Sequence, residues 1–149
     1  MFEEIYKWFK SLFGDNLSRQ LSGYSADEEG FFIETVAASQ YFQIGVITLA
    51  IALVFMLLYY YVFNHPRFNR WWSWLIVLVL TGVTNLFVGF GWTVKYAGEG
   101  IIGDNEASLV YLSDCWGFGF ANLIISTLWF IVLSLTFKWW SHNCKYSPF

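Results

Sequence analysis

The sequence has little charge. Only 13% of its 149 residues are Asp, Glu, Lys or Arg, and its mean hydropathy is +0.49. Soluble domains usually carry about a quarter charged residues, so this composition argues against a fold surrounded by water. The net charge of −3 also argues against a nucleic-acid partner, which requires a basic face to neutralise phosphates. We therefore expect the lipid bilayer to be the main partner of this chain.

Cysteine and histidine are equally scarce. Cys115 and Cys144 lie at opposite ends of an apolar segment, so if that segment crosses a membrane they cannot form a disulfide or share a zinc ion. His65 and His142 lie outside the apolar segments, and we interpret them as polar loop residues. No metal and no cofactor are expected.

Catalytic motifs are missing as well. The sequence contains no G-x-S-x-G, no P-loop and no dinucleotide-binding glycine motif placed between a strand and a helix. The apolar runs contain no Asp, Glu, Lys, Arg or His, which argues against proton-coupled transporters, pumps and voltage sensors. No catalytic residue is predicted, and an enzyme is not expected. A lipid-modifying enzyme that uses the loop residues His65, His142 or Asp104 stays open as an alternative.

Three long uncharged runs dominate what is present, at residues 35–64, 71–94 and 115–137. Each meets the requirement of about 20 apolar residues for a transmembrane helix. The sequence predicts an all-α integral membrane fold with three transmembrane helices and an amphipathic N-terminal helix, in one membrane domain. The predicted parts are an N-terminal helix and tail (1–22), an acidic connector (23–41), a first span (42–63), a second span (71–94), an acidic loop (95–114), a third span (115–137) and a C-terminal tail (138–149).

The basic residues near the spans predict the orientation. Arg67 and Arg70 share one side with Lys138 and Lys145, whereas Lys95 alone flanks the other side. Cytoplasmic loops carry the excess of Lys and Arg. We expect loop 64–70 and the C-terminus in the cytoplasm, with the N-terminus and loop 95–114 extracytoplasmic. The N-terminus lacks the pattern of a cleavable signal peptide, so we expect the first span to act as an uncleaved insertion signal.

The N-terminal segment has an amphipathic pattern. Phe2, Ile5, Phe9 and Leu12 recur at helical spacing, and Gly14 ends the run. Such a helix can lie flat at a membrane interface, or it can pack on the protein's own loop 95–114. Both interpretations stay open from the pattern alone.

A stripe of small and polar residues recurs in all three predicted spans, each time at i, i+3 and i+7, which places it on one helix face. Its members are Gly45, Thr48 and Ala52 in the first span, Gly82, Asn85 and Gly89 in the second, and Gly119, Asn122 and Ser126 in the third. Each set lies in the half of its span nearer loop 95–114. Asn85 and Asn122 need hydrogen-bond partners, because an unbonded amide in hydrocarbon costs several kcal/mol.

Two interpretations of this stripe compete. Small residues let helix backbones approach closely in membranes and polar ones bond across the interface, which predicts helix packing. Alternatively, Thr81, Asn85, Asn122 and Ser126 line a pore, with Asp104 and Glu106 near its mouth attracting cations. One chain with three helices encloses too little space for a water path, so the pore requires a homo-oligomer.

Three functions follow from these patterns. The first hypothesis is an oligomeric ion channel or membrane-permeabilising pore, including an effector role. The second is a non-conducting accessory or scaffold subunit bound to another membrane subunit. The lipid-modifying enzyme is the third.

Overall fold

Three long helices form the body of the protein. The computed structural model describes residues 2–26, 32–34, 39–62, 71–97 and 110–138. Helix α4 (Gln40–Leu57) continues into a π-helical turn, η1 (Leu58–Val62), and is followed by α5 (Trp71–Ala97) and α6 (Leu112–Lys138). All three helices are apolar and long enough to cross a membrane, as the uncharged runs predicted.

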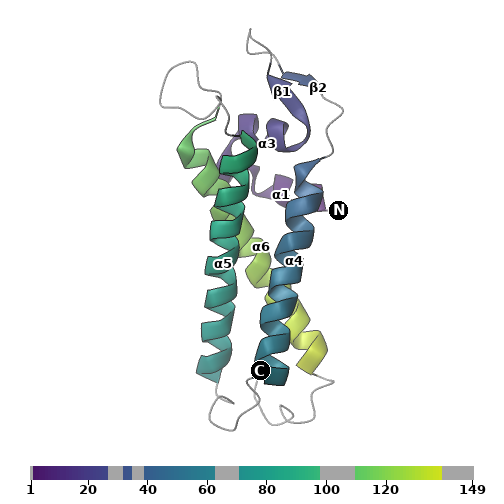
Figure 1. Ribbon diagram of the computed structural model, residues 1–149, viewed down its shortest axis with the longest axis vertical. Coiled ribbons are helices and arrows are strands. Elements are labelled where there is room, and N and C mark those ends of the chain that lie inside the picture. The colour runs from purple at the N-terminus through teal and green to yellow at the C-terminus, as the bar shows by residue number, and fades with distance from the viewer. Residues whose placement is uncertain (1, 27–31, 35–38, 63–70, 98–109, 139–149) are drawn as a thin grey trace.

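The third of these helices is oblique to the other two. Figure 1 shows α4 and α5 running side by side while α6 crosses behind them, from the start of α6 near α5 to its end near α4. The contact between α5 and α6 is the most extensive in the structure. Because α6 is inclined, α4 and α6 diverge at the end where both begin, and the N-terminal segment fills the angle between them.

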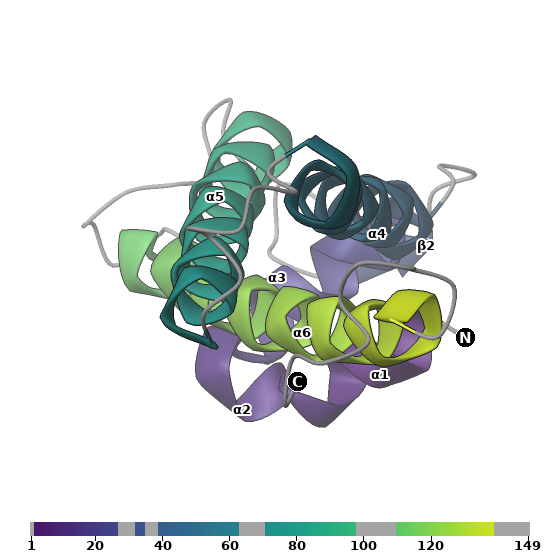
Figure 2. The same ribbon diagram turned by 90° about the horizontal axis from the view of Figure 1, so that it is seen from below.

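That segment forms three short helices, α1 (Phe2–Trp8), α2 (Lys10–Phe13) and α3 (Asp15–Leu21), where the sequence predicted one amphipathic helix and a tail. Gly14, between α2 and α3, has a φ of 76°, a left-handed conformation that glycine adopts without steric cost. Figures 1 and 2 show α1 and α2 lying across the bundle rather than along it. Within the described part of the chain they pack mainly against α4 and α6, so the segment does pack on its own chain. Most of loop 95–114, the expected contact, lies outside the described residues.

A short hairpin lies between this segment and α4, inside the region predicted as an acidic connector. Strands β1 (Tyr24–Ala26) and β2 (Phe32–Glu34) pair antiparallel, with Ser25 opposite Ile33. Aromatic and β-branched residues in both strands favour the extended conformation. The architecture is helical as expected, and this small hairpin is an addition that the sequence patterns did not predict.

Candidate functional site

The stripe residues all face the interior. Each of the nine is buried, although they come from three helices. Thr48, Asn85, Asn122 and Ser126 have no exposed surface, and the same holds for Thr81. The structure therefore collects the candidate residues of the sequence into one interior region of a single chain.

Asn122 is the hub of this region. Its Oδ1 accepts a hydrogen bond from the Thr48 hydroxyl on α4 at 2.8 Å and another from the Tyr6 hydroxyl on α1 at 2.5 Å. Its Nδ2 donates to the backbone carbonyl of Asn85 on α5 at 2.7 Å. One amide on α6 thus bonds to three other helices. We call Tyr6, Thr48, Asn85 and Asn122 the polar hub.

Tyr6 reaches the hub through an aromatic pocket. Its ring stacks on Phe118 with centroids 5.3 Å apart and also lies 5.6 Å from the ring of Tyr41. Phe13 contacts the same Phe118 ring edge-on at 5.2 Å. Burial raises the pKa of Tyr6 well above its ordinary value, so the phenol stays neutral and remains a hydrogen-bond donor.

Two glycines hold the N-terminal segment in place. A Cβ on Gly45 would lie 2.5 Å from the ring of Phe2, and a Cβ on Gly117 would lie 1.9 Å from the backbone carbonyl oxygen of Leu12. Real Cβ contacts are not this short, so only glycine lets the segment approach α4 and α6 so closely. We call Gly45 and Gly117 the glycine seats. Gly45 belongs to the predicted stripe, whereas Gly117 does not.

The other stripe glycines bring α5 and α6 together. A Cβ on Gly89 would lie 2.9 Å from the Cβ of Asn122, and one on Gly119 would lie 2.9 Å from the backbone oxygen of Leu86. At Gly82 the nearest atom would be the Thr127 hydroxyl oxygen, at 3.2 Å. This close contact is the chemistry by which small residues pack helices in membranes.

The remaining polar stripe residues bond mainly within their own helices. The Thr81 hydroxyl donates to the Val77 carbonyl, and the Ser126 hydroxyl donates to the Leu123 carbonyl. Asn85 Nδ2 donates to the Thr81 carbonyl at 3.1 Å, while its Oδ1 has no hydrogen-bond partner in the part of the chain that the structure describes. Thr81, Asn85 and Ser126 have no exposed surface within the described part of a single chain.

A second buried polar cluster lies toward the other end of the bundle. Ser134 on α6 accepts a hydrogen bond from the indole nitrogen of Trp74 at 2.9 Å and bonds with the Tyr60 hydroxyl at 2.7 Å. Tyr60 lies in the π-helical turn η1, a rare conformation that is frequent at functional sites. This cluster joins the ends of all three long helices and was not predicted from the sequence.

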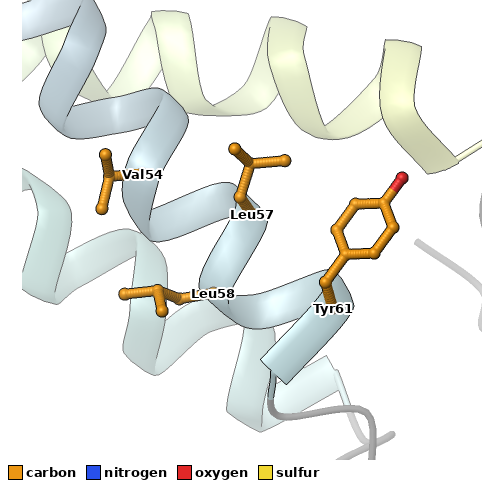
Figure 3. A pocket seen from close by; sticks show the side chains of 4 residues that line it. All are labelled: Val54, Leu57, Leu58 and Tyr61. Carbon is orange, nitrogen blue, oxygen red and sulfur yellow. The ribbon is translucent and has the colours of Figure 1, made fainter.

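The outer surface of the described residues contains a shallow apolar groove. Val54, Leu57, Leu58 and Tyr61 line this groove, and Figure 3 shows that all four side chains come from one helix, α4 with its extension η1. Among the described residues, no three His, Cys, Asp or Glu side chains come together as a metal site. The groove is hydrophobic apart from the Tyr61 hydroxyl and contains nothing that performs chemistry.

Some predicted residues lie outside the described part of the chain. They are Asp104 and Glu106, proposed at a pore mouth, together with His65, His142 and Cys144. Conversely, sequence reasoning missed Tyr6 as a hub residue and Gly117 as a seat. The signal for Tyr6 was its place in the amphipathic run, one turn after Phe2, but that pattern gives no partner. No protein-family model, curated protein or solved structure matches this chain.

Proposed function

We propose that this chain is a multi-pass membrane protein that acts as a non-conducting accessory or scaffold subunit. One observation carries the proposal: the polar stripe residues Thr48, Asn85, Asn122 and Ser126 are buried inside a single chain, and the Asn122 amide joins four helices through its hydrogen bonds. Polar groups used in this way hold helices together and leave no lining for water or ions.

The outward surface supports the same conclusion. On α5 the exposed side chains between residues 72 and 87 are all apolar and include Trp72, Ile76, Val79, Val83 and Phe87. A water-soluble protein rarely exposes so large an apolar patch, whereas lipid or a membrane partner covers it without cost. A protein whose polar stripe residues are buried and whose surface is apolar acts through the lipid or the membrane partner that this surface contacts. The proposed orientation keeps loop 64–70 and the C-terminus in the cytoplasm.

Reconstitution tests this proposal. Purified protein in liposomes should produce no ion flux above that of empty liposomes, and native mass spectrometry in nanodiscs should give a monomer or a complex with a different subunit. Flux that falls when Asn85 and Asn122 are both replaced by Leu in a folded protein would refute the proposal and restore the pore interpretation.

A channel is the second candidate, because Tyr6 covers Thr48 and Asn122 from a segment outside the long helices. In a homo-oligomer, withdrawal of α1 would uncover these two polar side chains. Under this alternative, Tyr6→Ala and deletion of residues 2–13 should both open a conductance that the wild-type protein lacks. If neither variant conducts, the polar hub has only a packing role.

A further inference from the structure

We propose that the N-terminal segment is a fourth membrane element, whose outer face contacts lipid at the headgroup boundary through Trp8 and Leu12. This inference rests on the proposed membrane location of the three long helices. Trp8 is 82% exposed, the highest exposure of any large hydrophobic side chain among the described residues. Leu12, one turn further along, is 46% exposed. A tryptophan in this position is typical of the membrane interface.

The depth of the segment supports lipid contact. Phe2 meets Gly45 and Tyr6 bonds with Thr48, which lie five and eight residues into α4. At about 1.5 Å per residue these positions are roughly 8 and 12 Å along the helix. Interfacial helices bury their apolar face about 5–10 Å into the boundary between headgroups and acyl chains. Because α1 lies across the bundle, its outer face runs along that boundary.

The start of the segment contacts the exposed apolar surface of a long helix. The Phe2 ring packs edge-on against Phe42 of α4, with centroids 6.1 Å apart, and Phe42 is itself 65% exposed. Whatever covers Phe42 therefore also reaches the start of α1. For a helix that crosses a membrane this covering is lipid, since an isolated apolar face in water is costly.

The charges on the segment indicate which kind of lipid surface it fits. Lys7 forms an ion pair with Glu3 at 2.7 Å, and Lys10 forms one with Asp15 at 2.8 Å. The hydrogen bond from Lys10 holds the pKa of the Asp15 carboxyl below its ordinary value, so this carboxyl is ionised at neutral pH. Both lysines are thus already neutralised, and we infer binding to a zwitterionic headgroup region without selection for anionic lipid.

Site-specific quenching tests the inference. In full-length protein with Cys115 and Cys144 replaced by Ser, a fluorophore is attached at Trp8→Cys and, in separate samples, at Leu12→Cys and Phe87→Cys. Each sample is placed in nanodiscs containing phosphatidylcholine with a nitroxide near the headgroup or near the chain end. Positions 8 and 12 should be quenched roughly twofold more strongly by the shallow nitroxide than by the deep one, and protected from aqueous iodide.

The control at Phe87, an exposed side chain on α5, separates the two proposals. Lipid quenching at 87 combined with iodide quenching at 8 and 12 would overturn the lipid-facing segment and leave the membrane location intact. No lipid quenching at 87 would instead refute the membrane location itself. Replacing part of the lipid with phosphatidylglycerol should leave the signal at position 8 unchanged, and a severalfold increase would overturn the charge-neutral contact.

Discussion

Replacing Asn122 with Ala should be among the most destabilising substitutions in this protein. The change keeps the Asn122 Cβ, the atom nearest to a Cβ built on Gly89, so part of the contact between α5 and α6 is preserved. What is lost is the set of three hydrogen bonds to Tyr6, Thr48 and the Asn85 carbonyl. The effect therefore measures these bonds together with the contact that the amide itself makes beside Gly89.

The magnitude follows from those bonds. Hydrogen bonds between membrane helices contribute about 0.6 kcal/mol on average and up to about 1.7 kcal/mol. Three such bonds give about 2 kcal/mol, and leaving two buried hydroxyls without their acceptor adds about 1–3 kcal/mol for each group that finds no other partner. The Tyr6 and Thr48 hydroxyls lie 3.4 Å apart and can bond to each other, which leaves one donor unpaired. We therefore expect Asn122→Ala to lower the free energy of unfolding by about 3–5 kcal/mol.

The assay is reversible unfolding in mixed micelles by titration with sodium dodecyl sulfate, followed by circular dichroism. Ser126→Ala is the matched control one turn away on the same helix, because the Ser126 hydroxyl bonds only to the carbonyl of Leu123. Ser126→Ala should lower the free energy of unfolding by less than about 0.5 kcal/mol. If Asn122→Ala costs no more than Ser126→Ala, the hub does not hold the helices together and the reasoning is wrong.

A double-mutant cycle isolates the bond from the N-terminal segment. Tyr6→Phe and Asn122→Ala should show a coupling energy of about 1 kcal/mol, because both remove the same hydrogen bond. Tyr41→Phe serves as the control, since the Tyr41 hydroxyl bonds to Ser18 and not to the hub. If the coupling energy with Asn122→Ala is the same for Tyr6→Phe and Tyr41→Phe, the substitutions weaken the packing of the whole region and the Tyr6–Asn122 bond has no specific contribution.

The remaining predictions concern the glycine seat Gly117, the Tyr6 hydroxyl and the buried polar cluster around Ser134. Gly117→Ala places a Cβ against the Leu12 carbonyl, so it should release the N-terminal segment and speed its cleavage in limited proteolysis. Gly91→Ala is the control, because a Cβ at that position meets nothing, and it should leave the cleavage rate unchanged. Because burial raises the pKa of Tyr6 above its unfolded value of about 10, its stabilising contribution is complete below that pH and is lost as pH rises further. Alkaline release of the segment should therefore be weaker in Tyr6→Phe, as measured by the same proteolysis. Ser134→Ala should lower the unfolding free energy by about 1–2 kcal/mol, since it removes the shared partner of Tyr60 and Trp74.

The three long helices could be predicted because each is specified by a local feature of the sequence. An uncharged run of sufficient length specifies a membrane-length helix without reference to the rest of the chain, and the structure has one over each run. The face of each long helix that points into the bundle could be predicted for a similar reason. Positions i, i+3 and i+7 share a face on any regular helix, so the stripe residues on α5 had to lie together.

The docking of the N-terminal segment could not be predicted, because its causes are distant in the sequence. Tyr6 bonds to a residue 116 positions away, and no local pattern contains that information. The breaks at Phe9 and Gly14 also change the helical phase. Leu12 was grouped with Phe2 on one apolar face, but it turns outward while Phe13 is buried. An apolar face drawn on one unbroken helix therefore places Leu12 on the wrong side, although Ile5 and Phe9 do pack against the core.

The inclination of α6 explains why this chain needs its N-terminal segment. Gly82, Gly89 and Gly119 bring α5 and α6 close together, and the oblique crossing then opens the angle between α4 and α6 where both helices begin. Thr48 alone bonds to Asn122 across that angle from α4. Tyr6, placed by the glycine seats, fills the angle with an aromatic ring and supplies the second donor to Asn122 Oδ1. The segment thus packs where α4 and α6 diverge, and its release should uncover the polar hub.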